Sequence, residues 1–182
     1  YLFKNKDVKK IAITSAIDGE GKSIIATNLS IALANNGNKV LLVDSNLRHP
    51  GLNKQFQIKE KEPGLTNIIL NNARLDQVIK IRKTTHENLF LLTSGKSKIA
   101  AHDMLTNKKM KDILKKLDSS DFNIILFDNS SLQHSESCVM SSRCDGTILV
   151  ISENTKKENV ITAKKKLEKL NSEIIGVIIN KK

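Results

Sequence analysis

Residues 11–23 constrain the fold of this chain more than any other stretch. The segment opens as a short apolar strand, turns through Gly19 and Gly21, and continues through Lys22 and Ser23 into a helical pattern. Glycines allow successive backbone amides to curl around a phosphate, and the following helix directs the positive end of its dipole at the same point. Lys22 would add a charge beside the β- and γ-phosphates, and the Ser23 hydroxyl would ligate Mg²⁺. This order of residues predicts a phosphate-binding loop.

The spacing of this loop departs from the usual pattern at one position. The pattern is G-x-x-x-x-G-K-[ST], and Ala16 stands where its first glycine belongs. A simpler interpretation is a glycine turn between a strand and a helix, with Lys22 merely solvated. The strand before the loop and the helix after it favour the phosphate site.

Five more apolar runs along the chain have the length of β-strands. They are residues 39–44, 88–93, 123–128, 147–152 and 174–180. Amphipathic helical patterns lie at residues 25–36, 107–117 and 160–170. Strands that are this uniformly apolar are covered on both faces. We therefore predict a single α/β domain over residues 1–182, with a mostly parallel central sheet in a three-layer α/β/α arrangement.

Two of these strands end in an aspartate, Asp44 and Asp128. Ligands of parallel sheets bind outside the carboxyl ends of the strands, so both side chains should face the phosphate loop. Either aspartate could instead be a helix N-cap or a turn residue. Their joint occurrence beside such a loop favours a site for magnesium and a nucleotide. We expect Lys22, Asp44 and Asp128 to be catalytic. The metal set would be Ser23, Asp44 and Asp128.

The chain carries a formal charge of +11, from 30 basic and 19 acidic residues. Such a surplus could serve nucleic acid, an anionic membrane face or nucleotide phosphates. Aromatic residues make up only 3% of the chain, and the basic residues are almost all lysines. Side chains that stack on bases are therefore scarce, and we do not expect nucleic acid as a partner. Solvated lysine faces explain most of the charge.

Other features of the sequence concern the cellular compartment of the protein. No apolar run approaches the ~20 residues of a membrane span, and the opening residues do not form a signal peptide. Because Tyr1 rather than Met opens the chain, we expect a fragment of a longer protein. Cys138 and Cys144 fit neither a zinc pattern nor a disulfide framework. We expect them to be buried thiols in a reducing cytoplasm.

With these residues assembled, the chain resembles the bacterial tyrosine kinases (BY-kinases), P-loop NTPases related to MinD and ParA and attached to capsule and exopolysaccharide export systems. The resemblance runs from about Lys9 to the end of the chain. Residues 15–23 are similar to the Walker A motif of these kinases, S-x-x-P-G-E-G-K-[ST]. Residues 41–50 are similar to their Walker A′ motif, L-[LI]-[IV]-D-x-D-[LM]-R-x-P, and residues 63–66 match P-G-L-[ST].

The resemblance implies a P-loop NTPase fold, ATP or ADP as the nucleotide, and Mg²⁺. It assigns nucleotide binding to a set that spans the loop and two more distant positions. This set is Asp18, Gly19, Glu20, Gly21, Lys22, Ser23, Ile24, Arg48 and Asn180. Asp44 would help to take the proton from a tyrosine hydroxyl, and Asp128 would orient the water shell of the metal. Arg48 either approaches phosphate or supports the Walker A′ loop. Asn180 lies near the adenine or is a strand-end turn residue.

The sequence also departs from the family at several positions. Asn46 replaces the second acid of Walker A′, and residues 129–131 read N-S-S where the family has [TS]-P-P after the Walker B aspartate. Ile17 stands where MinD and ParA proteins carry a signature lysine, which favours the kinase branch. We therefore predict an Mg-ATP-binding domain that transfers the γ-phosphate to protein tyrosines and regulates polysaccharide synthesis or export. The alternative is a catalytically weakened, ATP-binding regulatory partner of an export complex. A ParA-like ATPase is less favoured.

The resemblance extends to partners. It implies a polysaccharide co-polymerase-type membrane protein, or the cytoplasmic segment of one, and a homo-oligomer in the parent protein. It implies a location in the cytoplasm, or at the inner face of the cell membrane through a partner or a further segment. Tyr1 is the only tyrosine of the chain, so the phosphorylated tyrosines would lie elsewhere.

Overall fold

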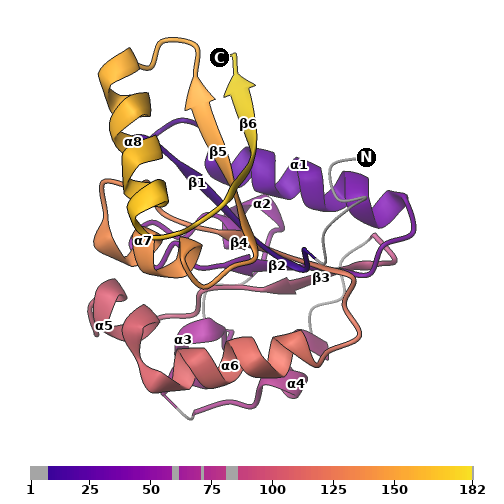
Figure 1. Cartoon of the computed structure of the whole chain (residues 1–182). Helices are drawn as coiled ribbons and strands as arrows, with labels where there is room; N and C mark the ends of the chain where they lie inside the picture. The colour runs from indigo at the N-terminus through magenta and orange to yellow at the C-terminus, as the bar shows by residue number, and fades with distance from the viewer. Residues whose placement is uncertain (1–7, 59–61, 71, 81–85, 182) are drawn as a thin grey trace.

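A computed structural model describes residues 8–58, 62–70, 72–80 and 86–181 of this chain. Over these residues, six parallel strands form one sheet in the order β3-β2-β4-β1-β5-β6 (Figure 1). The strands are β1 Lys10–Ser15, β2 Val40–Asp44, β3 Leu89–Leu92, β4 Ile124–Asp128, β5 Gly146–Ser152 and β6 Ile174–Asn180. The sheet confirms each strand that the apolar runs predict. It also confirms the parallel arrangement.

Helices connect the strands and cover both faces of the sheet except at the edge strand β6, where Val177 and Ile179 are exposed, so the predicted cover on both faces was wrong for this strand. They are α1 Lys22–Asn35, α2 Leu52–Gln55, α3 Leu65–Ile69, α4 Leu75–Lys80, α5 Ala101–Thr106, α6 Lys108–Asp118, α7 Ser135–Ser141 and α8 Lys157–Lys169. Three of them, α1, α6 and α8, confirm the predicted helices. The predicted apolar face of α1 was wrong, because the structure buries Ala26, Ser30 and Ala34 and leaves Ala32 exposed. The other five have four to seven residues each, too few for a helical period to show in the sequence.

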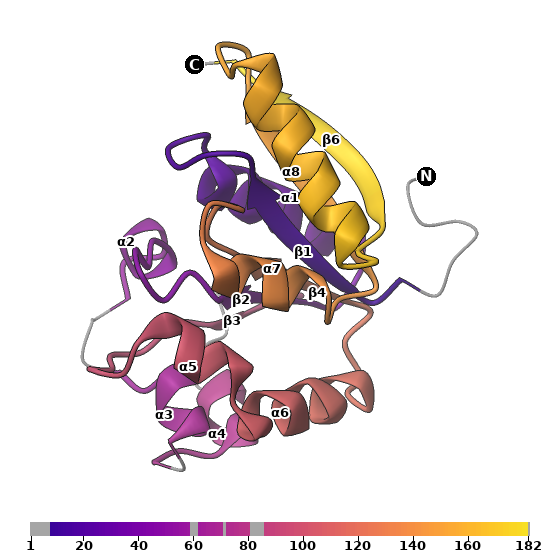
Figure 2. The ribbon, with the colours of Figure 1, turned by 60° about the vertical axis from the view of Figure 1, so that its left-hand side comes forward.

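The alternation of side chains along the strands separates the core into two sides. On β2, Leu41 and Val43 pack against α3 to α7, while Leu42 points to the opposite face and packs with α1 and α2. Leu149 of β5 packs beneath α8. Figure 2 shows α1 behind the sheet, α7 and α8 in front of it, and α6 below β2 and β3. This is the predicted three-layer α/β/α architecture.

The strand order determines what surrounds the predicted phosphate loop. Strand β1 lies between β4 and β5, so the loop that follows it has strand ends on both sides. Strands β2 and β4 are adjacent, and their last residues, Asp44 and Asp128, face each other in register. Chain segments that are far apart in sequence therefore meet at the carboxyl edge of the sheet.

Two smaller observations concern the expectations on compartment. Among the helices of the described residues, none combines the length and the apolar character that crossing a bilayer requires. Cys138 and Cys144 are free cysteines of intermediate exposure, so the expectation of buried thiols was correct only in part. Each cysteine is partly buried against a hydrophobic cluster. Cys144 packs against the cluster that includes α6, and Cys138 packs against the cluster beneath α8.

Candidate nucleotide-binding site

The loop after β1 has the backbone conformation that binding an anion requires. Gly19 and Gly21 have φ angles of 79° and 86°, in the left-handed region that favours glycine. A Cβ atom at Gly21 would also lie 2.3 Å from the Asn180 side-chain nitrogen. Gly21 is the N-cap of α1, and no side chain accepts a hydrogen bond from the first amides of this 14-residue helix. These amides remain available for a phosphate.

The buried side chain of Glu20 holds this loop in shape. Its Oε2 accepts a hydrogen bond from the Ile17 amide at 2.9 Å, inside the loop. Its Oε1 accepts one from the amide of Ser152, the last residue of β5, at 2.9 Å, and another from the Thr155 hydroxyl just beyond this strand. The carboxylate thus ties the loop to a neighbouring strand. Because the Glu20 side chain is used in this way, only the backbone of Glu20 is left to approach a nucleotide.

Replacement of Glu20 should show this role in the stability of the fold. Both carboxylate oxygens accept hydrogen bonds, but Gln has one acceptor oxygen, so Glu20→Gln leaves a partly buried amide without its partner. We expect the free energy of unfolding to fall by about 1–3 kcal/mol. Urea denaturation measures it, with the exposed Glu153→Gln as the matched control. Equal stability of the two variants would contradict the assigned role.

Asn180, at the end of β6, contacts the same loop from the other side. Its Nδ2 donates a hydrogen bond to the Glu20 carbonyl oxygen at 3.0 Å. The side chain therefore does more than complete a strand-end turn, because it joins the edge strand to the phosphate loop. The Ile24 side chain is 58% exposed, so only the backbone of this residue belongs to the loop.

The Lys22 side chain is 6% exposed, which excludes the interpretation of a solvated lysine. Burial lowers the pKa of its ammonium group, against the opposing effect of nearby carboxylates, Asp128 first among them. The ammonium therefore lies in a buried, acid-lined part of the site. A negatively charged ligand would find this charge and the free amides of α1 together.

Asp44 and Asp128 are both fully buried. Asp44 accepts hydrogen bonds from the amides of Asn46, at 3.2 Å, and Leu52, at 3.3 Å. Burial and the adjacent charge of Asp128 raise the pKa of Asp44 to about 8. Burial raises the pKa of Asp128 to about 6, although the Ser23 hydroxyl and the Lys22 charge act to lower it.

The oxygens of Asp128 show that a cation fits this site. Both are buried, and within the described residues neither has a partner in hydrogen-bonding geometry, although the Ser23 hydroxyl lies close by. Two buried carboxyl groups on adjacent strands, with a hydroxyl beside them, form a set of oxygen ligands that suits Mg²⁺. Buried carboxylates without partners are costly, and a bound cation would remove much of that cost.

Two side-chain contacts beside the site were not predicted from the sequence. The Arg48 guanidinium donates a hydrogen bond from Nε to the buried carboxylate of Glu136, on α7. This ion pair favours support of the loop after β2 over direct contact with phosphate. His134 Nε2 lies 3.0 Å from the Asp18 carboxylate. Although burial acts in the opposite direction, this contact helps to hold the pKa of Asp18 below its ordinary value.

Asn46 occupies the position of the missing second acid. It is 8% exposed, and its Oδ1 accepts a hydrogen bond from the His49 amide at 3.3 Å within the same loop. Its side chain therefore shapes the turn after β2 and adds no charge beside Asp44. The residues at 129–131 are also buried.

The fold and this loop define the class of the protein: it is a P-loop nucleotide-binding domain. A protein-family model described as an AAA domain matches residues 8–152, so the chain belongs to that family. The tyrosine-protein kinase YwqD of Bacillus subtilis (strain 168) is 33% identical over 180 residues, which cover 98% of this chain and 74% of YwqD. The tyrosine-protein kinase CpsD of Streptococcus agalactiae is 33% identical over 184 residues, or 98% of this chain and 78% of CpsD. Within the P-loop class, the chain belongs to the bacterial tyrosine-protein kinases.

Solved structures agree with this assignment. The kinase domain of VpsO has a TM-score of 0.92 and 30% identity, over 99% of this chain and 88% of VpsO. The chimerical protein CapA2B2 has a TM-score of 0.90 and 28% identity, over 97% of this chain and 77% of CapA2B2. The septum site-determining protein MinD from Pyrococcus horikoshii OT3, complexed with Mg-ADP, has a TM-score of 0.80 and 25% identity, over 94% of this chain and 70% of MinD.

Proposed function

We propose that this domain binds Mg-ATP and transfers its γ-phosphate to tyrosine side chains of proteins. The observation that carries the proposal is the pair of buried aspartates, Asp44 and Asp128, beside a glycine loop with free amides and a buried Lys22. The relatives YwqD and CpsD are named tyrosine-protein kinases, which supports phosphate transfer to tyrosine as the reaction. The Mg-ADP bound to MinD supports the ligand.

Each part of the site has a role in phosphoryl transfer, which depends on positioning and charge neutralisation. The amides of Asp18 to Ile24 and the Lys22 ammonium hold the phosphates. Ser23 and Asp128 hold the metal, with Asp44 beside them. When bound, magnesium supplies positive charge that offsets the phosphate oxygens.

Asp44 is the residue to which we assign the tyrosine proton. Without bound metal, the pKa of Asp44 is about 8, near neutral pH, where a general base is most effective. Its hydrogen bonds from the Asn46 and Leu52 amides orient the carboxylate. Arg48 acts through its ion pair with Glu136, which holds the loop that carries Asn46 in place.

The second candidate is an ATP-binding regulator that phosphorylates little. The neutral Asn46, turned toward its own loop, and the altered residues 129–131 favour this candidate. Incubation with labelled ATP and a protein carrying a tyrosine-rich tail separates the two. Label on the acceptor supports the kinase. ATP binding without label transfer overturns the kinase proposal in favour of the regulator.

Restoring the missing acid should raise activity. We expect Asn46→Asp to transfer phosphate about tenfold faster, because a negative charge returns beside Asp44 and strengthens electrostatic stabilisation of the metal site. Initial rates at saturating Mg-ATP measure it. Asn107→Asp, at the exposed N-cap of α6, adds the same charge away from the site and should change nothing. An unchanged rate for Asn46→Asp would support the regulator.

We further propose that the domain acts with a CapA-type partner, a polysaccharide co-polymerase-type membrane protein or its cytoplasmic segment. The name of the chimerical protein CapA2B2 and that of a putative tyrosine-protein kinase of Staphylococcus aureus, CapB, support this partner. Such a partner would hold the domain at the inner face of the membrane. Co-purification with the cytoplasmic segment of the partner, with and without Mg-ATP, tests the interaction.

A further inference from the structure

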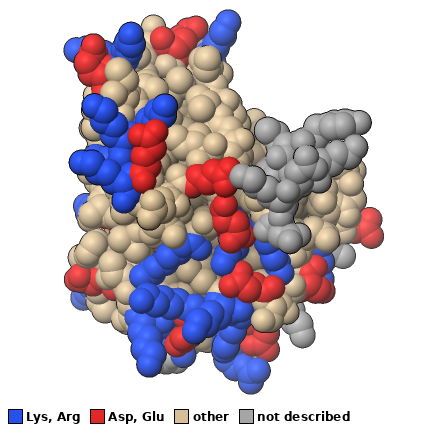
Figure 3. All heavy atoms as spheres, viewed as in Figure 1, with Lys and Arg blue, Asp and Glu red and all other residues tan. Residues whose placement is uncertain are grey.

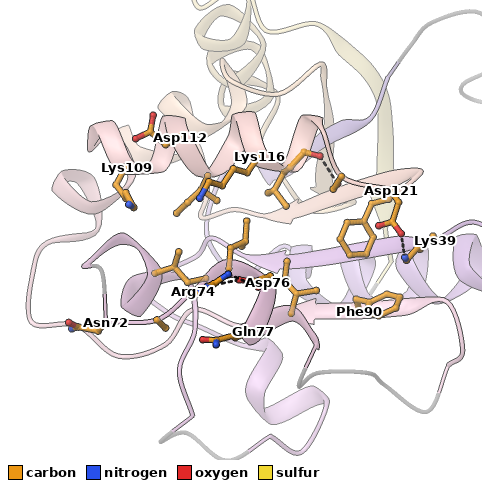
Figure 4. Close-up of a pocket in the computed structure, with 18 residues that line it drawn as sticks. Lys39, Asn72, Arg74, Asp76, Gln77, Phe90, Lys109, Asp112, Lys116 and Asp121 are labelled. Atoms are coloured by element: carbon orange, nitrogen blue, oxygen red, sulfur yellow. Dashed lines mark hydrogen bonds and ion pairs between the residues drawn. The ribbon is translucent and has the colours of Figure 1, made fainter.

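A cavity of about 880 Å³ lies far from the nucleotide site, between α4, α6 and the edge strand β3 (Figure 4). Lys39, just before β2, and Phe122, just before β4, both line it, so it lies at the amino ends of these strands. The phosphate loop lies at their carboxyl ends. None of the residues of the phosphate loop lines the cavity, nor do Asp44 and Asp128. Its volume falls in the range of small-molecule sites, roughly 300–1,000 Å³.

One end of the cavity is apolar and aromatic. The rings of Phe90 and Phe122 meet edge to face with their centroids 5.4 Å apart. Ile113 and Leu117 of α6 extend this apolar wall. The Lys39 ammonium lies 5.4 Å from the centroid of Phe90 but is already paired with Asp121. This end therefore offers apolar surface with no free charge.

The α6 side of the cavity also carries unpaired positive charge. Arg74 is paired with Asp76 at 3.2 Å. Lys109 and Lys116 of α6 have no ion pair within the described residues.

Figure 4 shows both lysines directed toward the cavity, whereas the carboxylate of Asp112, which lies between them on the helix and also lines the cavity, is directed upward in this view. Figure 3 shows basic side chains gathered over this part of the surface.

We propose that this cavity binds a small amphipathic organic anion. Its aromatic or aliphatic body would lie against Phe90 and Phe122, and its anionic group would contact Lys109 and Lys116. An apolar wall and two unpaired cations in the same cavity are complementary to such a molecule in shape and charge. The site is separate from the nucleotide site and does not depend on the function proposed for that site.

The fluorescent probe 8-anilinonaphthalene-1-sulfonate, an aromatic body with one anionic group, tests the proposal on the whole chain. We expect saturable binding of one probe molecule, with no displacement by Mg-ATP. The double variant K109Q/K116Q should weaken binding at least about tenfold. The matched control K111Q/K115Q removes two exposed charges of the same helix that do not line the cavity, and should bind as the unchanged chain does.

A second variant tests the space itself. Ala73 lines the cavity, and Ala73→Trp should fill it and abolish probe binding. Circular dichroism shows whether the Ala73→Trp protein is folded. If it is not, Gln77→Trp, at the exposed rim of the cavity, takes its place in the test. Equal losses in the two lysine double variants, unchanged binding in the Trp variant, or displacement by Mg-ATP would each overturn the proposal.

Discussion

Lys22→Ala should weaken ATP binding by about 10²–10³-fold, because truncating one partner of a buried charge pair costs about 2–5 kcal/mol. The ammonium is buried among carboxylates, and its pKa responds to Asp128, Asp18 and Glu20. Without it, the phosphates would meet these negative charges directly. Isothermal titration calorimetry with Mg-ATP measures the loss.

The control for this variant is Lys108→Ala, an exposed lysine at the start of α6 and outside the site. It should bind ATP as the unchanged chain does. Denaturation of Lys22→Ala shows whether the variant is folded, since it loses a buried charge. A folded Lys22→Ala protein with unchanged affinity would refute the phosphate-loop assignment.

The nucleotide-free protein should lose stability as the pH rises, and Asp44 should account for most of the loss. The folded-state pKa of Asp44, about 8, lies above its ordinary value of 3.8. The native state therefore binds a proton that the unfolded state has released. Stability is highest below the unfolded-state pKa and falls until the pH passes the folded-state value. From about pH 6 to pH 8.5, we expect a loss of about 2–3 kcal/mol.

Asp44→Asn should flatten this profile and make the protein more stable at high pH, because no buried charge remains at that position. Urea denaturation across the pH range measures both effects, with the exposed Asp103→Asn as control. Mg²⁺ should stabilise the unchanged chain more at high pH than at low pH, since it binds deprotonated carboxylates. The same variant should slow phosphoryl transfer by about 10²–10³-fold. A pH profile that Asp44→Asn does not alter would contradict the assignment.

Much of the fold is readable from local order in the sequence. Six apolar runs of strand length indicate a parallel sheet, because strands covered on both faces lack polar alternation. The edge strand β6 is the exception, since it is equally apolar but leaves Val177 and Ile179 exposed. Parallel strands align their carboxyl ends, so the carboxylates of Asp44 and Asp128 and the loop before Lys22 could be expected together. The short helices α2 to α5 and α7 could not be predicted, because fewer than two turns leave no period to recognise.

The contacts that support the site could not be read in the same way. Glu20 occupies a position of the Walker A motif, which suggests a contact with the nucleotide. Its carboxylate instead accepts a hydrogen bond from the amide of Ser152, 132 residues away. His134 shows no pattern in the sequence. Its contact with Asp18 follows from the adjacency of β1 and β4 and from the length of the loop after β4.

The sequence by itself determined the sheet, the phosphate loop and the two aspartates, because these depend on periodicity and on residues that are neighbours along the chain. Only the tertiary structure decided which side chains brace the loop, and that Arg48 pairs with Glu136. It alone revealed the cavity beneath α6, whose lining comes from α4, α6 and segments beside three strands. Such contacts depend on side-chain packing between segments that are distant in sequence. A local pattern of residues therefore cannot predict them.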